Sequence, residues 1–143
     1  MRSTIIVSLE YRDKEEVLKK IIEFGNRNKL KIVPKEDVLS LGDIGLSKKI
    51  NDNEFNYLEF SITEKDEFKT QHISNSSVVN GKRYYFYVWI DHTSNNQALH
   101  SLNEFLNEIL TDNPDMLVTD EATKNFYSLK QIKNKQVPEW LLI

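Results

Sequence analysis

Residues 80–91 read NGKRYYFYVWID, and this stretch decides the fold. Asn80 and Gly81 both tolerate the positive φ that the two central residues of a type I′ hairpin turn require, and apolar residues flank them. The run from Tyr84 to Asp91 is rich in aromatic and β-branched residues, which favour strands. The stretch therefore predicts a hairpin whose outgoing strand is Tyr84–Asp91.

Upstream of this hairpin, two further strands and a helix are predicted. Residues 4–11 are β-branched without a helical period, which is typical of a buried strand. Asp13 is a suitable N-cap for a helix that runs to about Asn28. Residues 55–63 alternate, with Leu58, Phe60 and Ile62 on one face, and predict a strand. The segment between them, residues 29–53, shows only a short strand signal around residues 30–33.

Downstream, leucine and isoleucine recur at helical spacing from Leu99 to Leu110, after several possible N-caps at residues 93–96. Asn113 and Pro114 end this helix. Residues 116–118 then fit a short edge strand, residues 121–127 a helical turn, and residues 137–143 an apolar tail docked on the core.

This order of elements predicts one α+β domain over residues 1–143, with two main helices on one face of an antiparallel, or mixed, sheet. A ferredoxin-like split is the first topology. The alternative is a longer antiparallel meander in which residues 68–79 form a further strand.

Composition favours a soluble, cytoplasmic protein. The 143 residues are 39% hydrophobic and 29% charged, and none is cysteine, so neither a disulfide framework nor a thiolate zinc site can form. No apolar run approaches the ~20 residues that cross a bilayer. The N-terminal residues lack the uninterrupted apolar stretch of a signal peptide.

The aromatic strand leaves two interpretations open. Strict alternation places Tyr84, Phe86, Val88 and Ile90 on one face, and Tyr85, Tyr87 and Trp89 on the other. Either the second face exposes three rings to a protein partner or to nucleic-acid bases, or the strand is central and buried on both sides.

Catalytic and metal-binding motifs are weak. The histidines, His72, His92 and His100, match no common metal-site spacing and are expected on polar surface. Glu67-Phe68-Lys69 has the acid-x-lysine form found in metal-dependent nucleases, but a solvated loop is the favoured interpretation. We therefore predict no catalytic, cofactor-binding or metal-binding residue and favour a protein that is not an enzyme.

Charge is distributed unevenly along the chain. The residues between Arg83 and Lys124 contain no lysine or arginine and carry seven carboxylates, in a chain of net charge −3. These carboxylates are Asp91, Glu104, Glu108, Asp112, Asp115, Asp120 and Glu121. Such a segment disfavours phosphate contacts and would attract a basic partner.

With its acidic helix around Glu104, Glu108 and Asp112, this small, lysine- and asparagine-rich chain of bacterial appearance resembles immunity proteins of contact-dependent or polymorphic toxin systems. The resemblance implies a cytosolic inhibitor that binds a cognate toxin domain, here a basic one such as a nuclease, without a cofactor, membrane or nucleic acid. The alternatives are a small metal-dependent enzyme acting on phosphoester bonds and an RNA-binding sheet module. The predicted partner-binding residues are Glu104, Glu108, Asp112, Asp115, Asp120, Glu121, Tyr85, Tyr87 and Trp89.

Overall fold

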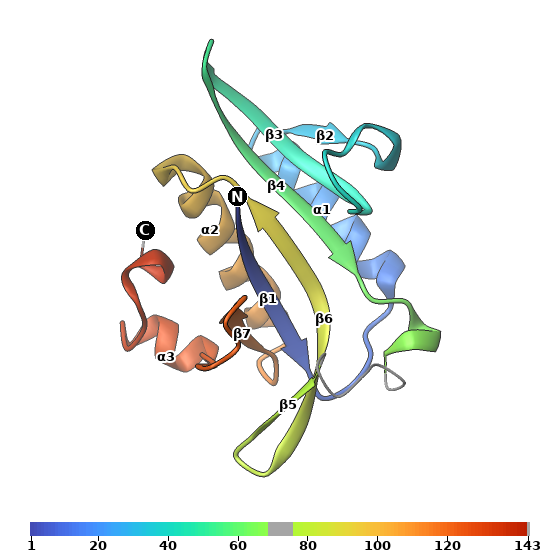
Figure 1. Ribbon diagram of the computed structural model, residues 1–143, viewed down its shortest axis with the longest axis vertical. Helices are drawn as coiled ribbons and strands as arrows, with labels where there is room; N and C mark the ends of the chain where they lie inside the picture. Colours follow the sequence, from blue (N-terminus) through green and yellow to red (C-terminus); the bar gives the residue numbers. More distant parts are fainter. Residues whose placement is uncertain (69–75, 143) are drawn as a thin grey trace.

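The computed structural model describes residues 1–68 and 76–142, in which strands and helices are combined in an α+β fold (Figure 1). The strands are β1 (Arg2–Ser8), β2 (Lys31–Val33), β3 (Ile44–Asn51), β4 (Glu54–Ile62), β5 (Ser76–Val79), β6 (Lys82–His92) and β7 (Leu117–Asp120). The helices are α1 (Lys14–Arg27), α2 (Asn96–Asp112) and α3 (Leu129–Lys133), with 3-10 turns η1 (Lys35–Asp37), η2 (Lys65–Glu67) and η4 (Glu139–Leu141).

The described strands form one antiparallel sheet in the order β2-β3-β4-β6-β1-β7, with β5 pairing to β6. The order β7-β1-β6-β4 within it is the order of a ferredoxin-like split. However, β2, β3 and β5 extend the sheet beyond four strands, so that topology is not confirmed.

The predicted hairpin forms at its predicted turn. Asn80 and Gly81 have φ values of 51° and 78°, and Val79 pairs with Lys82 across the turn. β5 is its incoming strand. Of residues 68–79, the alternative meander strand, only 76–79 are described as strand, and residues 69–75 lie outside the described part of the chain.

Both long helices begin at the predicted kind of cap. The Asp13 carboxylate accepts a hydrogen bond from the Glu15 amide at 3.1 Å, and the Asn95 side chain accepts one from the Ala98 amide at 2.8 Å. These bonds satisfy amides that the first turn of a helix leaves without partners.

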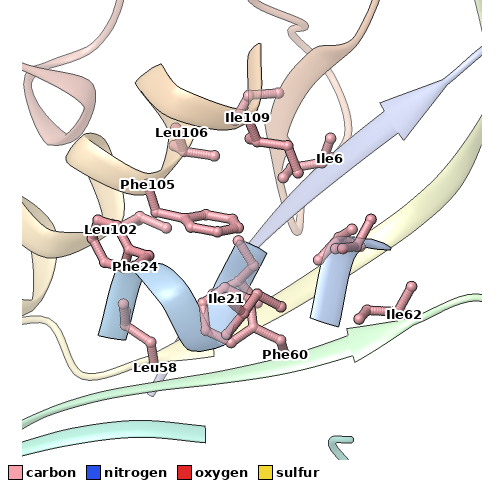
Figure 2. Packing of buried hydrophobic residues seen from close by; sticks show 14 of the residues in the cluster. Ile6, Ile21, Phe24, Leu58, Phe60, Ile62, Leu102, Phe105, Leu106 and Ile109 are labelled. Atoms are coloured by element: carbon pink, nitrogen blue, oxygen red, sulfur yellow. The ribbon is translucent and has the colours of Figure 1, made fainter. Parts of the chain in front are cut away.

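The main core lies between these two helices and one face of the sheet, which we call the helix face (Figure 2). Ile21 and Phe24 of α1 and Phe105 of α2 pack over Phe60 of β4, and the Phe105 ring lies edge-on to both other phenylalanine rings. The expected apolar stripes of the helices, and the inward face of residues 55–63, therefore meet as predicted.

One extra residue in β6 changes which aromatic rings share a face. Ile6 of β1 pairs with Val88, but the next residue, Val7, pairs with Phe86, so Tyr87 has no partner in β1 and forms a β-bulge. Beyond the bulge the alternation is reversed. Tyr85 and Tyr87 consequently join Val88 and Ile90 on the helix face, and the predicted grouping of Tyr85, Tyr87 and Trp89 on one face is wrong.

Two other sequence expectations are corrected. Residues 121–127 form no helical turn; they reverse direction so that Tyr127 forms a bridge with Val118 of β7. His92, expected on polar surface, is 1% exposed, because it ends β6 on the helix face. No helix among the described residues is both long enough and apolar enough to cross a membrane.

Candidate functional site

The opposite face of the sheet, which we call the open face, carries an aromatic cluster without any helix residue. Ile5 and Val7 of β1 are buried together with Phe86 of β6, the strand partner of Val7, and four partly exposed side chains pack against them. These four are Tyr84, Trp89, Leu117 and Phe126. In Figure 1 the two long helices lie behind the sheet, so this face looks toward the viewer.

Trp89 makes both an aromatic and a polar contact in this cluster. Its ring centroid lies 6.1 Å from that of Phe86, and its indole N–H donates to Asp91 Oδ1 at 2.9 Å. Asp91 also accepts a hydrogen bond of 2.6 Å from the Ser3 hydroxyl. A half-buried tryptophan beside a carboxylate is thus held in a fixed orientation on the open face.

Polar residues cross the open face at one level of the sheet. Asp91 of β6 is paired in register with Ser3 of β1 on one side and with Glu59 of β4 on the other. Asp120, at the end of β7, pairs with Thr4, whose side chain contacts His92 on the helix face, so Asp120 lies on that face as well. Glu121 follows in the turn after β7. Register therefore brings two carboxylates, Glu59 and Asp91, side by side on the open face.

The carboxylates of α2 and the segment after it are, in contrast, paired with the protein's own cations. Glu108 binds Arg27 of α1 with both oxygens at 2.6 Å, and Asp112 is paired with Lys20 of the same helix. These pairs line a groove of about 470 Å³ between α1 and α2. The expected free negative patch on this helix is therefore corrected: its charge is largely balanced.

Two further predicted residues differ in their partners. Asp115 receives both its contacts, at 2.9 Å, from the Arg12 guanidinium. Glu104 lies 2.5 Å from His100, one helical turn away, and contacts no lysine or arginine among the described residues. In the described part of the chain, the acidic side chains of the segment without a lysine or arginine partner are thus Asp91, Glu104, Asp120 and Glu121.

The three predicted rings are divided between the two faces. Tyr87 is completely buried, with its hydroxyl donating to the Arg12 carbonyl at 2.5 Å, and burial raises the pKa of that hydroxyl. Tyr85 packs against Phe68 in the main core. Of the three, Trp89 remains available on the open face.

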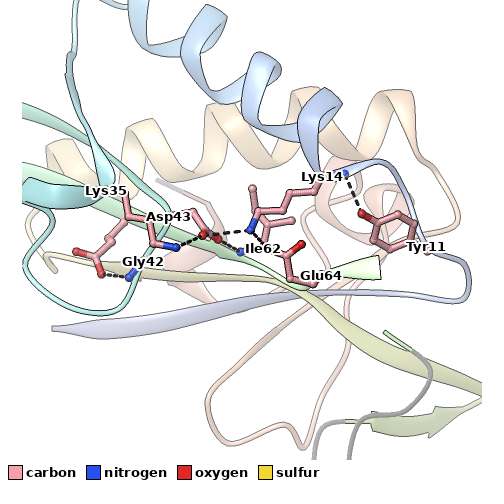
Figure 3. A network of polar contacts seen from close by, with 8 residues as sticks. Tyr11, Lys14, Lys35, Gly42, Asp43, Ile62 and Glu64 are labelled. Atoms are coloured by element: carbon pink, nitrogen blue, oxygen red, sulfur yellow. Dashed lines mark hydrogen bonds and ion pairs between the residues drawn. The ribbon is translucent and has the colours of Figure 1, made fainter. Parts of the chain in front are cut away.

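A second polar cluster joins α1 to the sheet (Figure 3). Lys14 Nζ lies 3.2 Å from Asp43 Oδ1 and 2.5 Å from Glu64 Oε1, and the other oxygen of Asp43 accepts the Ile62 amide. Burial by itself would lower the pKa of Lys14, but the two carboxylates outweigh it and raise that pKa. Burial would raise the pKa of Asp43, yet the Ile62 amide and Lys14 hold it below its usual value. Because every charge is compensated, this cluster is a structural tie.

Metal-binding geometry is absent from the part of the chain that the structure describes, where no three histidine, aspartate or glutamate side chains converge. His92 is hydrogen-bonded to Thr4 Oγ1 at 3.0 Å and to the Thr93 carbonyl at 2.9 Å. Glu67 lies in η2, while Lys69 and His72 fall outside the described residues.

Sequence reasoning missed Glu59, the most buried carboxylate of the open face. The alternation of residues 55–63 puts Glu59 on the face opposite Leu58, Phe60 and Ile62, and alternation alone suggests an exposed side chain there. The loop that covers it, residues 34–43, lies in the segment with the weakest pattern. Comparison of the chain with models of protein families, with curated proteins and with solved structures finds no match.

Proposed function

We propose that this chain is a cytoplasmic inhibitor of the immunity-protein kind, which binds a basic protein such as a nuclease toxin domain through the open face of its sheet. The observation that carries the proposal is the partly exposed aromatic cluster around Trp89, which no helix covers. Tryptophan and tyrosine dominate the centres of protein–protein interfaces, because they bury a large apolar area and still offer a polar group.

The charges around this cluster favour a basic partner. Asp91 lies beside Trp89 on the open face, and Glu121 follows β7 at the same end of the sheet; neither is in an ion pair among the described residues. Unpaired carboxylates at the rim of an apolar patch accelerate association with a positive surface, and their effect weakens as salt rises.

Neither alternative is supported by a comparable observation. The metal-dependent enzyme would need converging ligands. The predicted RNA-binding module would stack bases on Tyr85, Tyr87 and Trp89, but Tyr85 and Tyr87 contribute to the main core instead. The carboxylate of Asp91 beside Trp89 also disfavours a phosphate backbone at this face.

To test the proposal, the tagged chain is used to capture a basic protein from its own cells. That partner is then purified, and its binding to variants of the chain is measured. Trp89→Ala should weaken binding by about tenfold or more, as expected for an interface centre. Asp91→Asn should slow association at low salt and have less effect at high salt. Circular dichroism verifies that both variants are folded.

The matched control is the double variant Glu108→Gln, Asp112→Asn on the opposite layer, which should bind as the unmodified protein does. Failure to recover any stable protein partner, or equal losses for the control and for Trp89→Ala, would contradict the proposed function.

A further inference from the structure

The loop from Pro34 to Asp43, between β2 and β3, is held by hydrogen bonds within itself and to the sheet. Near its start the Asp37 amide donates to the Pro34 carbonyl at 2.9 Å, and at its end the Asp43 amide donates to the Phe60 carbonyl of β4 at 2.7 Å. At its far end the Asp43 carboxylate contacts Lys14 and Lys35, as Figure 3 shows. The loop is thus fixed at both ends.

Glu59 fixes the middle of the loop. Its side chain is 2% exposed, and Oε1 accepts the amides of Leu39 and Ser40 at 2.9 and 3.2 Å. Oε2 accepts the Gly42 amide at 3.0 Å, and the Tyr57 hydroxyl donates to Oε1 as well. A buried carboxylate is unfavourable unless hydrogen bonds compensate it, and here four donors do so.

Gly42 is required for this arrangement. A Cβ atom at this position would lie 2.4 Å from Cγ and 2.8 Å from Oε2 of Glu59, so any side chain would displace the carboxylate. Burial and the hydrogen bond to Glu59 also raise the pKa of Tyr57 to about 12, which keeps its hydroxyl a donor at neutral pH.

This fixed backbone carries two leucines that point away from the protein. Leu39 is 67% exposed and Leu41 is 94% exposed. A single exposed leucine is ordinary, but here two of them flank one serine on a loop whose backbone is already ordered. A partner that buries them need not order the loop first, which favours affinity.

Resting on the proposed function, we infer that the loop of Leu39–Gly42 is a preformed apolar contact of the same binding surface, and that it inserts Leu41 into an apolar pocket of the basic partner. Charge supports this choice of partner: Glu36 and Asp37, just before the loop, are exposed and in no ion pair among the described residues, whereas Lys35 is paired with Asp43. The loop rim is therefore negative.

The contact is tested first by position-specific photocrosslinking in cells that produce the protein. A photoreactive phenylalanine analogue at position 41 should crosslink to a basic protein. This protein should be the same partner whose binding Trp89→Ala weakens. The control position is Ile22, which is 39% exposed on α1 of the other layer and should give no such product. Crosslinks from position 22 but not from position 41 would overturn the inference.

Affinity for the purified partner is measured next. The double variant Leu39→Ala, Leu41→Ala should bind at least about tenfold more weakly, with an unchanged fold because both side chains are exposed. The matched control Ile22→Ala should retain full affinity. Because the double variant leaves Glu59 and the loop backbone unchanged, it tests the contribution of the two leucines to binding independently of any effect of a Glu59 substitution on folding.

Glu59→Gln tests whether the loop must be preformed. It keeps both leucines but weakens the acceptor, so hydrogen exchange at the amides of Leu39, Ser40 and Gly42 should accelerate and affinity should fall. If the partner binds with unchanged affinity to the double leucine variant, the loop contact is refuted while the proposed function stands. If no partner is found at all, the proposed function itself fails.

Discussion

At the scale of single residues, two buried polar side chains, Glu59 and His92, are satisfied entirely by neighbours brought together by folding. Glu59 is compensated by loop amides and by Tyr57, and His92 by Thr4 and Thr93. Water cannot replace a hydrogen-bond partner that is lost in the interior. Removing one donor, or adding one charge, at these sites should therefore lower the free energy of unfolding.

Tyr57→Phe removes one of the four donors to the Glu59 carboxylate without changing the size of the ring. We expect the free energy of unfolding to fall by about 1.5–3 kcal/mol, the range for a hydrogen bond to a charged group. Chemical denaturation measures the change. The matched control is Tyr84→Phe, which affects a partly exposed ring on the same face and should change stability by less than about 0.5 kcal/mol.

Burial lowers the pKa of His92 below its usual value of 6.5. The unfolded chain therefore binds the proton more tightly than the folded protein does. Stability from this residue should be complete above pH 6.5 and should be lost as pH falls through 6.5 toward the lower folded-state pKa. Denaturation curves at several pH values should show this slope, and His92→Gln should reduce it.

At the scale of elements, the bulge in β6 determines what each aromatic ring does. Because Tyr87 is the extra residue, it joins Tyr85 in the main core, while Trp89 lies on the open face. Without the bulge, strict alternation would place Tyr85, Tyr87 and Trp89 on one face. One inserted residue therefore separates a core ring from a surface ring two positions away.

Replacing the rings of Tyr87 and Tyr84 by alanine should reduce the stability of the protein by different amounts. Tyr87→Ala should lower the free energy of unfolding by about 3–5 kcal/mol, the range for truncating a fully buried aromatic ring. Tyr84→Ala, on the open face, should lower it by clearly less. Thermal or chemical denaturation distinguishes the two, and comparable losses would argue against the bulge as the structure places it.

At the scale of the whole molecule, the carboxylates differ in how they are compensated. Glu108, Asp112 and Asp115 are paired with Arg27, Lys20 and Arg12, while Asp91 on the open face and Glu121 after β7 form no ion pair among the described residues. An approaching basic protein should therefore interact more strongly with Asp91 and Glu121 than with these paired carboxylates.

Neutralising the paired carboxylates of α2 should consequently have little effect on stability or on association with the partner. Because the Arg27–Glu108 and Lys20–Asp112 pairs are exposed, Glu108→Gln combined with Asp112→Asn should change the free energy of unfolding by at most about 1 kcal/mol. Stopped-flow association with the basic partner should keep its rate and its salt dependence. Neutralising Asp91 and Glu121 together should reduce both; a reduction by the helix variant instead would restore the acidic helix as the binding surface.

The sequence by itself determined the features that depend on neighbouring residues. The Asn80-Gly81 turn, the cap at Asp13, the helical period of residues 99–110 and the alternation of residues 55–63 all formed as predicted, because each is a local preference of the backbone or of one amphipathic element. The α+β class follows from their order.

The tertiary structure alone decided which of these residues could act. The register between β1 and β6 creates the bulge. Tertiary packing pairs Glu108, Asp112 and Asp115 with cations 81 to 103 residues away in the sequence. A loop whose sequence shows no clear pattern covers Glu59. The physical reason is that pairing and burial depend on contacts between distant segments, and neither period nor composition records where those segments meet.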